Sequence, residues 1–285
     1  MEEKNMNSTT EKLARCISNA CKAKQKPNNH GTSEWSVKTV NCCTGCSHDC
    51  VYCYAKEMAL RFGQITASQW PLEQIRQPDV RKRHKKYDGQ IMFPSSHDIT
   101  PNNLASCLTV LEKLFYAGNQ VLVVSKPHLE CIEKICEEFM SYRSQILFRF
   151  TIGACDDGIL SFWEPNAPVY DERRNCLIYA HEAGFKTSVS VEPMLDSANI
   201  DMLIEDLMPY VSDSIWIGIM NHTGRFGKNA NPVLQQAIQK IRRGQTNNII
   251  KGIYQRHKNN PMIKWKAEIK KIVGIPLPKK PGMDI

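Results

Sequence analysis

Long hydrophobic runs are missing from this chain of 285 residues. No stretch of about 18 consecutive apolar residues occurs, so no membrane-spanning helix is expected. The first five residues, Met1 to Asn5, are polar and lack the apolar core of a secretory signal peptide. Twelve cysteines would suggest disulfides in a secreted protein. Without a secretion signal, we instead expect reduced thiols and a cytoplasmic protein with no membrane partner.

Acidic residues are scarce near the C-terminal end. From Arg225 to Ile285 there are 14 lysines and arginines but two acidic residues, Glu268 and Asp284, which gives this segment a charge of +12. The whole chain carries +8, so the first 224 residues carry −4. This change in charge predicts a boundary near residue 225. The basic segment is either a solvated surface or a region that contacts a nucleic-acid backbone.

Cysteines are concentrated in the loop at residues 44–55. Cys46, Cys50 and Cys53 are spaced C-x3-C-x2-C, with Tyr52 directly before the third cysteine. Three thiolates can bind three irons of a four-iron cluster and leave the fourth iron open to a small molecule. Cys43 leaves a second interpretation open, a closed four-thiolate zinc or iron–sulfur site. No redox role can be assigned from the sequence to Cys42, which precedes these residues.

Short β-branched and apolar runs alternate with helical patterns along most of the chain. Six strands are predicted, at residues 36–41, 90–93, 119–124, 145–152, 187–191 and 214–220. In the basic segment, helices are predicted at 233–241, 248–256 and 262–272. Strands that alternate with helices favour an α/β fold with a parallel sheet. The pattern alone does not exclude an open, doubly wound sheet.

Polar residues follow each predicted strand. The segments are the cysteine loop, Pro94 to Asp98, Ser125 to His128, Thr151 to Asp157, Glu192 with Pro193, and Asn221 with His222. In a barrel, the carboxyl ends of the strands carry the chemistry. Ser96, Asp98 and Asn221 could each serve as a helix N-cap instead. Capping does not readily explain polar residues at all six ends.

The cysteine loop, with Gly45 and Tyr52 as flanking residues, resembles the radical S-adenosylmethionine (SAM) superfamily. Its local sequence is most similar to spore photoproduct lyase-like and phage-encoded radical proteins. The resemblance implies a partial (β/α)6 barrel of parallel strands at 36–224, between a polar N-terminal extension at 1–35 and a basic, mainly helical extension at 225–285. It also implies an oxygen-sensitive [4Fe-4S] cluster, S-adenosyl-L-methionine and a reductant such as flavodoxin or ferredoxin.

Roles for individual residues follow from the resemblance. Cys46, Cys50 and Cys53 match the cluster ligands, and Tyr52 matches the position that lies against the adenine of SAM. The family usually has a Gly-Gly-Glu-type segment after the second strand, where this chain has Ser95-Ser96-His97-Asp98. The expected cofactor-binding residues are Tyr52 for the adenine, Ser96 and Asp98 for the amino group, Lys126 for the carboxylate and Thr151 for the ribose. Glu192 is also expected to contact the cofactor.

Two residues are expected to take part in catalysis. Glu192 is more readily explained by function than by structure, because an unpaired glutamate is rarely buried. Cys155 could donate hydrogen as a further cysteine does in spore photoproduct lyase, although a plain loop thiol is the more ordinary interpretation.

The resemblance implies an enzyme that cleaves SAM to a 5′-deoxyadenosyl radical and abstracts hydrogen from a substrate. Nucleic-acid repair or modification, in which the enzyme would be a lyase or a transferase, is favoured by the basic extension. Modification of a peptide or small molecule is the alternative, although the last cysteine is Cys176 and no cysteine-rich extension follows it. From another class, a zinc-stapled nucleic-acid-binding module remains open.

Overall fold

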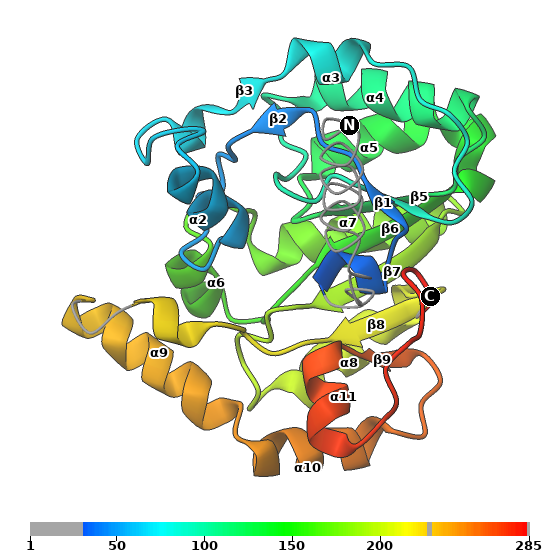
Figure 1. The fold of residues 1–285 in the computed structure, drawn as a ribbon. Helices are drawn as coiled ribbons and strands as arrows, with labels where there is room; N and C mark the ends of the chain where they lie inside the picture. The colour runs from blue at the N-terminus through cyan, green and yellow to red at the C-terminus, as the bar shows by residue number, and fades with distance from the viewer. Residues whose placement is uncertain (1–30, 227–229, 284–285) are drawn as a thin grey trace, which may run out of the picture.

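The computed structural model describes residues 31–226 and 230–283 (Figure 1). Within these residues, seven strands form one parallel sheet in the order β1-β4-β5-β6-β7-β8-β9. Their bounds are β1 (Lys38–Thr39), β4 (Ile91–Phe93), β5 (Val121–Ser125), β6 (Ile146–Thr151), β7 (Lys186–Val191), β8 (Ser214–Ile217) and β9 (Ile263–Trp265). The first six occupy the predicted strand positions. The remaining two strands, β2 (Cys43–Thr44) and β3 (Gln74–Ile75), form a separate antiparallel pair beside the cysteine loop.

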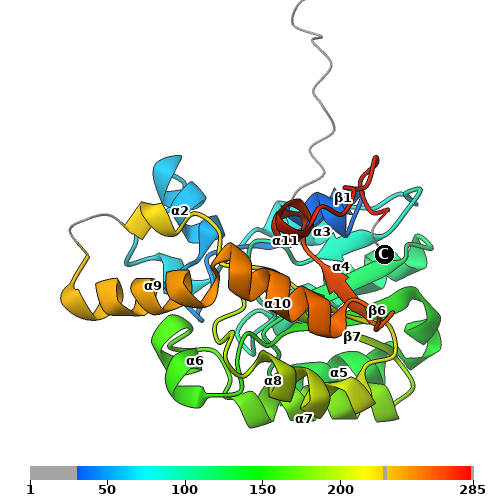
Figure 2. The same cartoon turned by 90° about the horizontal axis from the view of Figure 1, so that it is seen from below.

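Helices connect the strands and cover the outer face of the sheet (Figures 1 and 2). The α-helices are α2 (Tyr54–Arg61), α3 (Gln77–Arg81), α4 (Leu104–Tyr116), α5 (Leu129–Glu138), α6 (Asp157–Trp163), α7 (Tyr170–Glu182), α8 (Ile200–Leu207), α9 (Pro232–Gly244), α10 (Asn247–His257) and α11 (Ala267–Val273). Short 3-10 helices are η1 (Gly31–Glu34), η2 (Trp70–Leu72), η3 (Met140–Gln145), η4 (Met208–Tyr210) and η5 (Thr223–Phe226). The predicted α/β fold with parallel strands is confirmed.

The two faces of the sheet differ in composition because neighbouring strand residues point to opposite sides. On β6, Phe148 and Phe150 pack in the large core beneath the helices. Leu147 faces the other way and belongs to a cluster with Met92 on β4, Val124 on β5 and Trp216 on β8. This inner face also carries polar groups, among them Arg149, which is fully buried and donates through Nε to Ser188 Oγ at 2.9 Å. The same alternation extends toward the carboxyl ends of the strands.

The predicted helix at 262–272 is wrong in its first part. Ile263 to Trp265 form β9, which pairs in parallel with β8 through Ile215↔Ile263 and Ile217↔Trp265. Ile263 and Trp265 are buried in the large core, and the helix α11 begins only at Ala267. The alternation of Ile263 and Trp265 with Lys264 is a strand period, but it is too short to be distinguished from a helix by pattern alone. The basic extension therefore contributes a strand to the sheet, although the predicted domain boundaries remain predictions.

The N-terminal extension, predicted at 1–35, lies mainly outside the described residues. Its described part, residues 31–35, packs against the rest of the chain. Glu34 is buried in η1, and Trp35 joins the inner-face cluster of the sheet. Trp35 and Trp216 contact each other edge to face at 5.7 Å between ring centroids.

A buried ion pair anchors the segment after α6 to the sheet. Arg173 on α7 and Glu164 are both fully buried, and Arg173 Nη1 lies 2.6 Å from Glu164 Oε2. Arg173 also donates to the carbonyl oxygens of Pro168 at 2.7 Å and Thr151 at 3.2 Å. In the same region, Val51 N donates to the Trp163 carbonyl at 2.9 Å, so this segment supports the cysteine loop.

We expect Arg173→Met to lower the free energy of unfolding by about 3–5 kcal/mol, because Glu164 would keep a buried charge without its partner. Chemical denaturation followed by circular dichroism measures this change. Arg174→Met is the matched control, because the ion pair of Arg174 with Asp206 is partly exposed and should contribute about 1 kcal/mol or less. Equal losses for the two variants would contradict the anchoring role of Arg173.

Candidate functional site

The carboxyl ends of the strands surround a cavity of about 330 Å³. It is lined by Cys46, Cys50, Tyr52, Cys53, Tyr54, Ala55, Trp70, Met92, Pro94, Ser95, Ser96, His97, Asp98, Val124, Lys126, Thr151 and Glu192. These residues come from the cysteine loop and the start of α2, from Trp70 in η2, and from the ends of β4, β5, β6 and β7. The structure therefore brings together every residue predicted to bind the cluster or the cofactor.

The three cysteines of the C-x3-C-x2-C segment all reach this cavity. Cys46 and Cys50 are buried, and Cys53 is half-buried at the start of α2. Cys53 Sγ accepts a hydrogen bond from the backbone N–H of Lys56 at 3.3 Å. A helix N-terminus favours a negatively charged sulfur, which is the form that binds a metal.

Gly45 determines how closely the loop approaches η2. Its φ is +97°, and a Cβ at this position would lie 2.3 Å from the carbonyl oxygen of Trp70. The same oxygen accepts the backbone N–H of Cys46 at 3.0 Å. A larger residue at 45 would therefore displace Cys46 from its position.

Cys43 does not line the cavity. It lies in β2, and its thiol contacts the backbone oxygens of Thr44 and Gly45 at 3.6 and 3.7 Å. Burial, followed by the nearby charge of Glu73, raises the pKa of the Cys43 thiol to about 12. The geometry favours three cysteine ligands over the closed four-thiolate site.

Burial also raises the pKa values of the three motif thiols. For Cys46 the charge of Asp98 adds to burial, whereas for Cys50 the nearby ammonium of Lys126 opposes it. For Cys53 the hydrogen bond from Lys56 opposes burial. An ion that binds these sulfurs must therefore displace protons from them.

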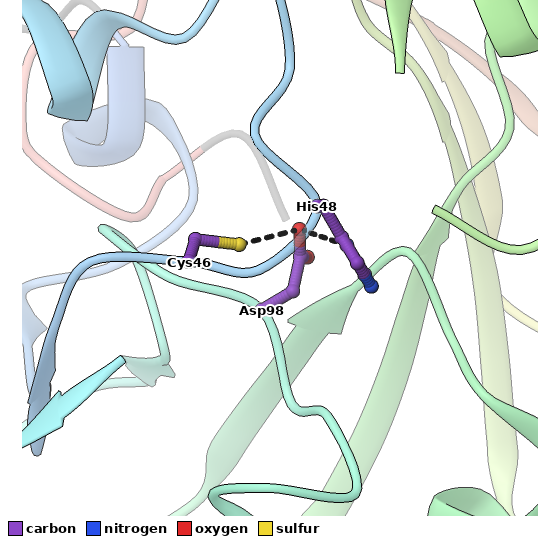
Figure 3. Close-up of side chains that lie close together, drawn as sticks. All are labelled: Cys46, His48 and Asp98. Atoms are coloured by element: carbon purple, nitrogen blue, oxygen red, sulfur yellow. Dashed lines mark hydrogen bonds and ion pairs between the residues drawn. The ribbon is translucent and has the colours of Figure 1, made fainter. Parts of the chain in front are cut away.

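Asp98 lies between Cys46 and His48, as Figure 3 shows. Its Oδ2 is 2.9 Å from Nδ1 of the fully buried His48 and 3.7 Å from Cys46 Sγ. Its Oδ1 accepts the backbone N–H of Lys126 at 2.8 Å and the Ser125 hydroxyl at 3.1 Å. Burial would raise the pKa of Asp98, but Lys126 and His48 hold it well below its usual range.

These contacts change the interpretation of Asp98. Both of its oxygens are engaged by the protein, so the carboxylate organises the site more directly than it offers an acceptor to a ligand. Asp98 also determines the environment of Lys126. Its Nζ lies 3.5 Å from Asp98 Oδ2 and 5.8 Å from the ring centre of Tyr52. Burial would lower the pKa of Lys126, but Asp98 and Cys50 raise it well above the usual value.

A residue that the sequence analysis did not single out holds the Ser95-Ser96 segment. Asn41 Oδ1 accepts the backbone N–H groups of Ser95 and Ser96 at 2.7 and 2.9 Å, and its Nδ2 donates to Ser95 Oγ at 2.9 Å. Asn41 follows β1, so the end of the first strand fixes the loop after β4. An asparagine in a polar loop carries no sequence signal for this role.

Glu164 is a second residue that the sequence did not reveal. Its Oε1 accepts a hydrogen bond from the hydroxyl of Tyr52, while its Oε2 pairs with Arg173. Burial, followed by the charge of Glu164, raises the pKa of Tyr52 well above its usual value. The Tyr52 ring is thereby held as a neutral wall of the cavity.

A second cavity of about 520 Å³ adjoins the first. Tyr52, Tyr54 and Glu192 line both of them. The end of β8 contributes to this second cavity through Asn221 and His222. All six predicted strand ends therefore meet across the two adjoining cavities.

Cys155 is not among the residues that line either cavity. It follows β6, is half-buried and packs against the large core beneath the helices. Burial raises the pKa of its thiol. A hydrogen-donor role for Cys155 has no support in this placement and stays a prediction.

Cys46, His48 and Asp98 also present ligand atoms within 4.8 Å of one another, as a single metal ion would require. Both ring nitrogens of His48 are engaged, Nδ1 by Asp98 and Nε2 by His128 Nε2 at 2.8 Å. A metal bound to His48 would break one of these contacts. The sulfurs of Cys50 and Cys53, in contrast, share the cavity with Cys46.

Within residues 31–226 and 230–283, no helix has the length and apolar content needed to cross a membrane.

No protein-family model matches the chain. A curated protein of Acidianus two-tailed virus, described as uncharacterized protein ORF301, is 23% identical over 205 residues, which cover 65% of this chain and 67% of that protein.

Solved structures give a closer likeness in fold. A mutant of spore photoproduct lyase with bound AdoMet and dinucleoside spore photoproduct superposes with a TM-score of 0.52, 16% identity, and coverage of 80% of this chain and 75% of the other. Streptococcus suis SuiB bound to its precursor peptide SuiA superposes with a TM-score of 0.50 and 11% identity. It covers 95% of this chain, which spans 58% of SuiB. The described part of the chain therefore shares its fold with spore photoproduct lyase and SuiB.

Proposed function

We propose that this protein is a radical SAM enzyme. In the proposal, Cys46, Cys50 and Cys53 bind a [4Fe-4S] cluster, and the cavity that they line receives S-adenosyl-L-methionine. The single observation that carries the proposal is that these three thiols, and not Cys43, share a cavity with the ends of the parallel strands. The fold likeness to a lyase structure that contains AdoMet supports it. When bound, the cluster supplies an electron that cleaves SAM to a 5′-deoxyadenosyl radical.

The lining residues have chemistry suited to SAM. Lys126 carries a buried positive charge at the end of β5, where it can pair with the carboxylate of the methionyl group. Ser96 offers a hydroxyl acceptor for the amino group, and Thr151 offers one for the ribose hydroxyls. Tyr52 provides a neutral aromatic wall for the adenine. Glu192, on the boundary between the cavities, contacts both the cofactor and the substrate in this proposal.

The substrate that we propose is a nucleic acid, which would occupy the second cavity. The spore photoproduct lyase structure contains a dinucleoside, and α9 of the basic extension lies beside this cavity. Ile238 and Ile241 on α9 pack with Met220, which lines the cavity. Lys240 and Arg243 on the same helix are exposed and line a separate hollow with residues 194–198. An exposed basic helix beside a cavity is suited to the phosphate backbone of a strand that enters it. A peptide substrate is the alternative, as SuiB binds a precursor peptide.

Metal content tests the cluster. We expect anaerobically reconstituted protein to hold about four irons per chain, because three thiolates bind one four-iron cluster. Cys50→Ala should lose nearly all iron and the brown colour, whereas Cys43→Ala should retain both, because the Cys43 thiol faces the backbone of its own strand. Iron and zinc are measured by mass spectrometry, and the cluster is measured by its visible absorption. One zinc per chain, lost in both variants, would favour the zinc-stapled module.

Cofactor cleavage tests the enzyme class. We expect the reconstituted protein, with dithionite and SAM, to form 5′-deoxyadenosine, measured by liquid chromatography and mass spectrometry. Cys50→Ala should form none. If wild-type protein with four irons forms none with SAM and with DNA or RNA oligonucleotides, an obligatory substrate of another class is indicated. If the protein binds only zinc and forms none, the proposed enzyme class is contradicted.

Oligonucleotide binding tests the substrate class. We expect Lys240→Glu/Arg243→Glu to weaken binding of a fluorescent single-stranded oligonucleotide about tenfold at low salt, and to reduce the salt dependence, because phosphate contacts release counterions. The control is Lys186→Glu, at the amino end of β7 and away from the cavities. If Lys186→Glu weakens binding to a similar extent, the binding is explained by non-specific electrostatic attraction. The peptide alternative would then be favoured.

A further inference from the structure

Lys266 connects the basic extension to the candidate site. It follows β9 directly, and its backbone N–H donates to the carbonyl of Ile217 on β8 at 2.9 Å. The side chain is 1% exposed, which is rare for lysine unless the charge is paired. Its Nζ lies 3.0 Å from Glu34 Oε1 and 3.4 Å from Glu192 Oε2. One ammonium therefore bridges two carboxylates from segments far apart in the sequence.

Glu34 and its neighbours fix this ammonium in place. Glu34 is fully buried and accepts the backbone N–H of Ala267 at 2.9 Å in addition to the ion pair. Lys266 Nζ also donates to the carbonyl of Gly31 at 3.0 Å and lies 4.0 Å from the ring centre of Trp35. These partners engage the Lys266 side chain in addition to Glu192. The Lys266 ammonium is consequently held in one position, from which it pairs with Glu192.

The packing around Gly218 holds the two side chains together. A Cβ on Gly218 would lie 2.8 Å from Lys266 Cγ and 2.9 Å from Glu192 Cγ. Lys266 and Glu192 therefore lie closely against Gly218, and a larger residue at this position would displace one of them. Glu192 is 22% exposed, and this exposed part borders both cavities.

The charges that surround Glu192 come from several elements. Burial raises the pKa of Glu192, Lys266 opposes this, and Glu268 on α11 and Glu34 in η1 add to it. Arg149 on β6 is a further nearby cation, and His222 after β8 shares the second cavity. Among the described residues, Lys266 is the cation within ion-pair distance of Glu192. Without Lys266, the pKa of Glu192 would rise further, and less of the carboxylate would be ionised near neutral pH.

We propose that Lys266 is a positioning residue that holds Glu192 as an ionised, oriented acceptor at the boundary between the two cavities. Glu192 then accepts hydrogen bonds from donors on the bound cofactor, such as ribose hydroxyls or an ammonium group. This inference rests on the proposed function, because it takes SAM as the ligand of the first cavity. It assigns a role in the site to the basic extension, beyond any contact with nucleic acid.

Binding of SAM to the reconstituted protein tests the inference without any turnover. Equilibrium dialysis with radiolabelled SAM at about pH 6 and about pH 9 gives the affinities. We expect Lys266→Met to weaken binding about tenfold at the lower pH, because each unit by which a pKa rises lowers the ionised fraction about tenfold below that pKa. At about pH 9 the carboxylate is ionised again, so the affinity should largely recover.

Three further variants control for folding and for general effects of charge. Lys271→Met, on the exposed face of α11, removes a charge of the same sign close by and should bind SAM as wild type does. Glu34→Gln/Lys266→Met removes both members of the buried ion pair, so that no unpaired Glu34 charge is left if the single variant fails to fold. Glu192→Gln should bind weakly at both pH values. Circular dichroism and iron content confirm that each variant is folded and loaded.

The double variant Lys266→Met/Glu192→Gln decides whether Lys266 acts through Glu192. If it does, the double variant binds SAM as weakly as Glu192→Gln alone. Additive losses, or a loss in Lys266→Met of equal size at both pH values, would overturn the positioning role and leave the proposed function intact. If wild-type protein with four irons binds no SAM, the proposed function fails, and this inference fails with it.

Discussion

Parallel pairing of the strands, with side chains that alternate between two faces, is the constraint on which the rest of this structure depends. Every neighbouring pair in the seven-stranded sheet is parallel, so the carboxyl ends of its strands lie at one edge. Alternation then separates the residues by chemistry. Phe148 and Phe150 pack beneath the helices, whereas Thr151, one residue further along β6, lines the cavity. Helices that cover the outer face leave the inner face and the strand ends for a ligand.

Buried charges organise this inner region, and each has a defined partner. Asp98 connects the cysteine loop to β5 through His48 and Lys126, Glu164 connects Tyr52 to α7 through Arg173, and Lys266 connects Glu192 to η1 through Glu34. A buried ion pair contributes little net stability, but the loss of one partner is costly. These pairs therefore act mainly by fixing which groups face the cavities. The cysteine loop is held by two of them, directly through His48 and Tyr52.

Segments that are distant in the sequence contribute side chains to one site. The cysteine loop supplies sulfur, β4 to β7 supply polar groups, and the C-terminal extension supplies Lys266. The likeness to spore photoproduct lyase and SuiB concerns the fold. In the function that we propose, the first cavity serves the chemistry that such enzymes share, and the second cavity selects the substrate. The contacts of Lys266 indicate that the extension belongs to the site as well as to the surface.

The sequence by itself determined which three cysteines form the motif, where six strands of the sheet lie, and that polar residues follow these strands. These features depend on local spacing and on periodicity. Thr151 and Glu192 were correctly expected near the cysteines, since the strand period and the parallel sheet place them there. Only the tertiary structure decided that Cys155 lies outside the cavities, that Asp98 is engaged by Lys126 and His48, and that Ile263 to Trp265 form a strand. Asn41, Glu164 and Lys266 were also missed. The contacts of Asn41 with Ser95, of Glu164 with Tyr52, and of Lys266 with Glu34 and Glu192 each join residues more than 50 positions apart. No local pattern records which distant groups will be buried together.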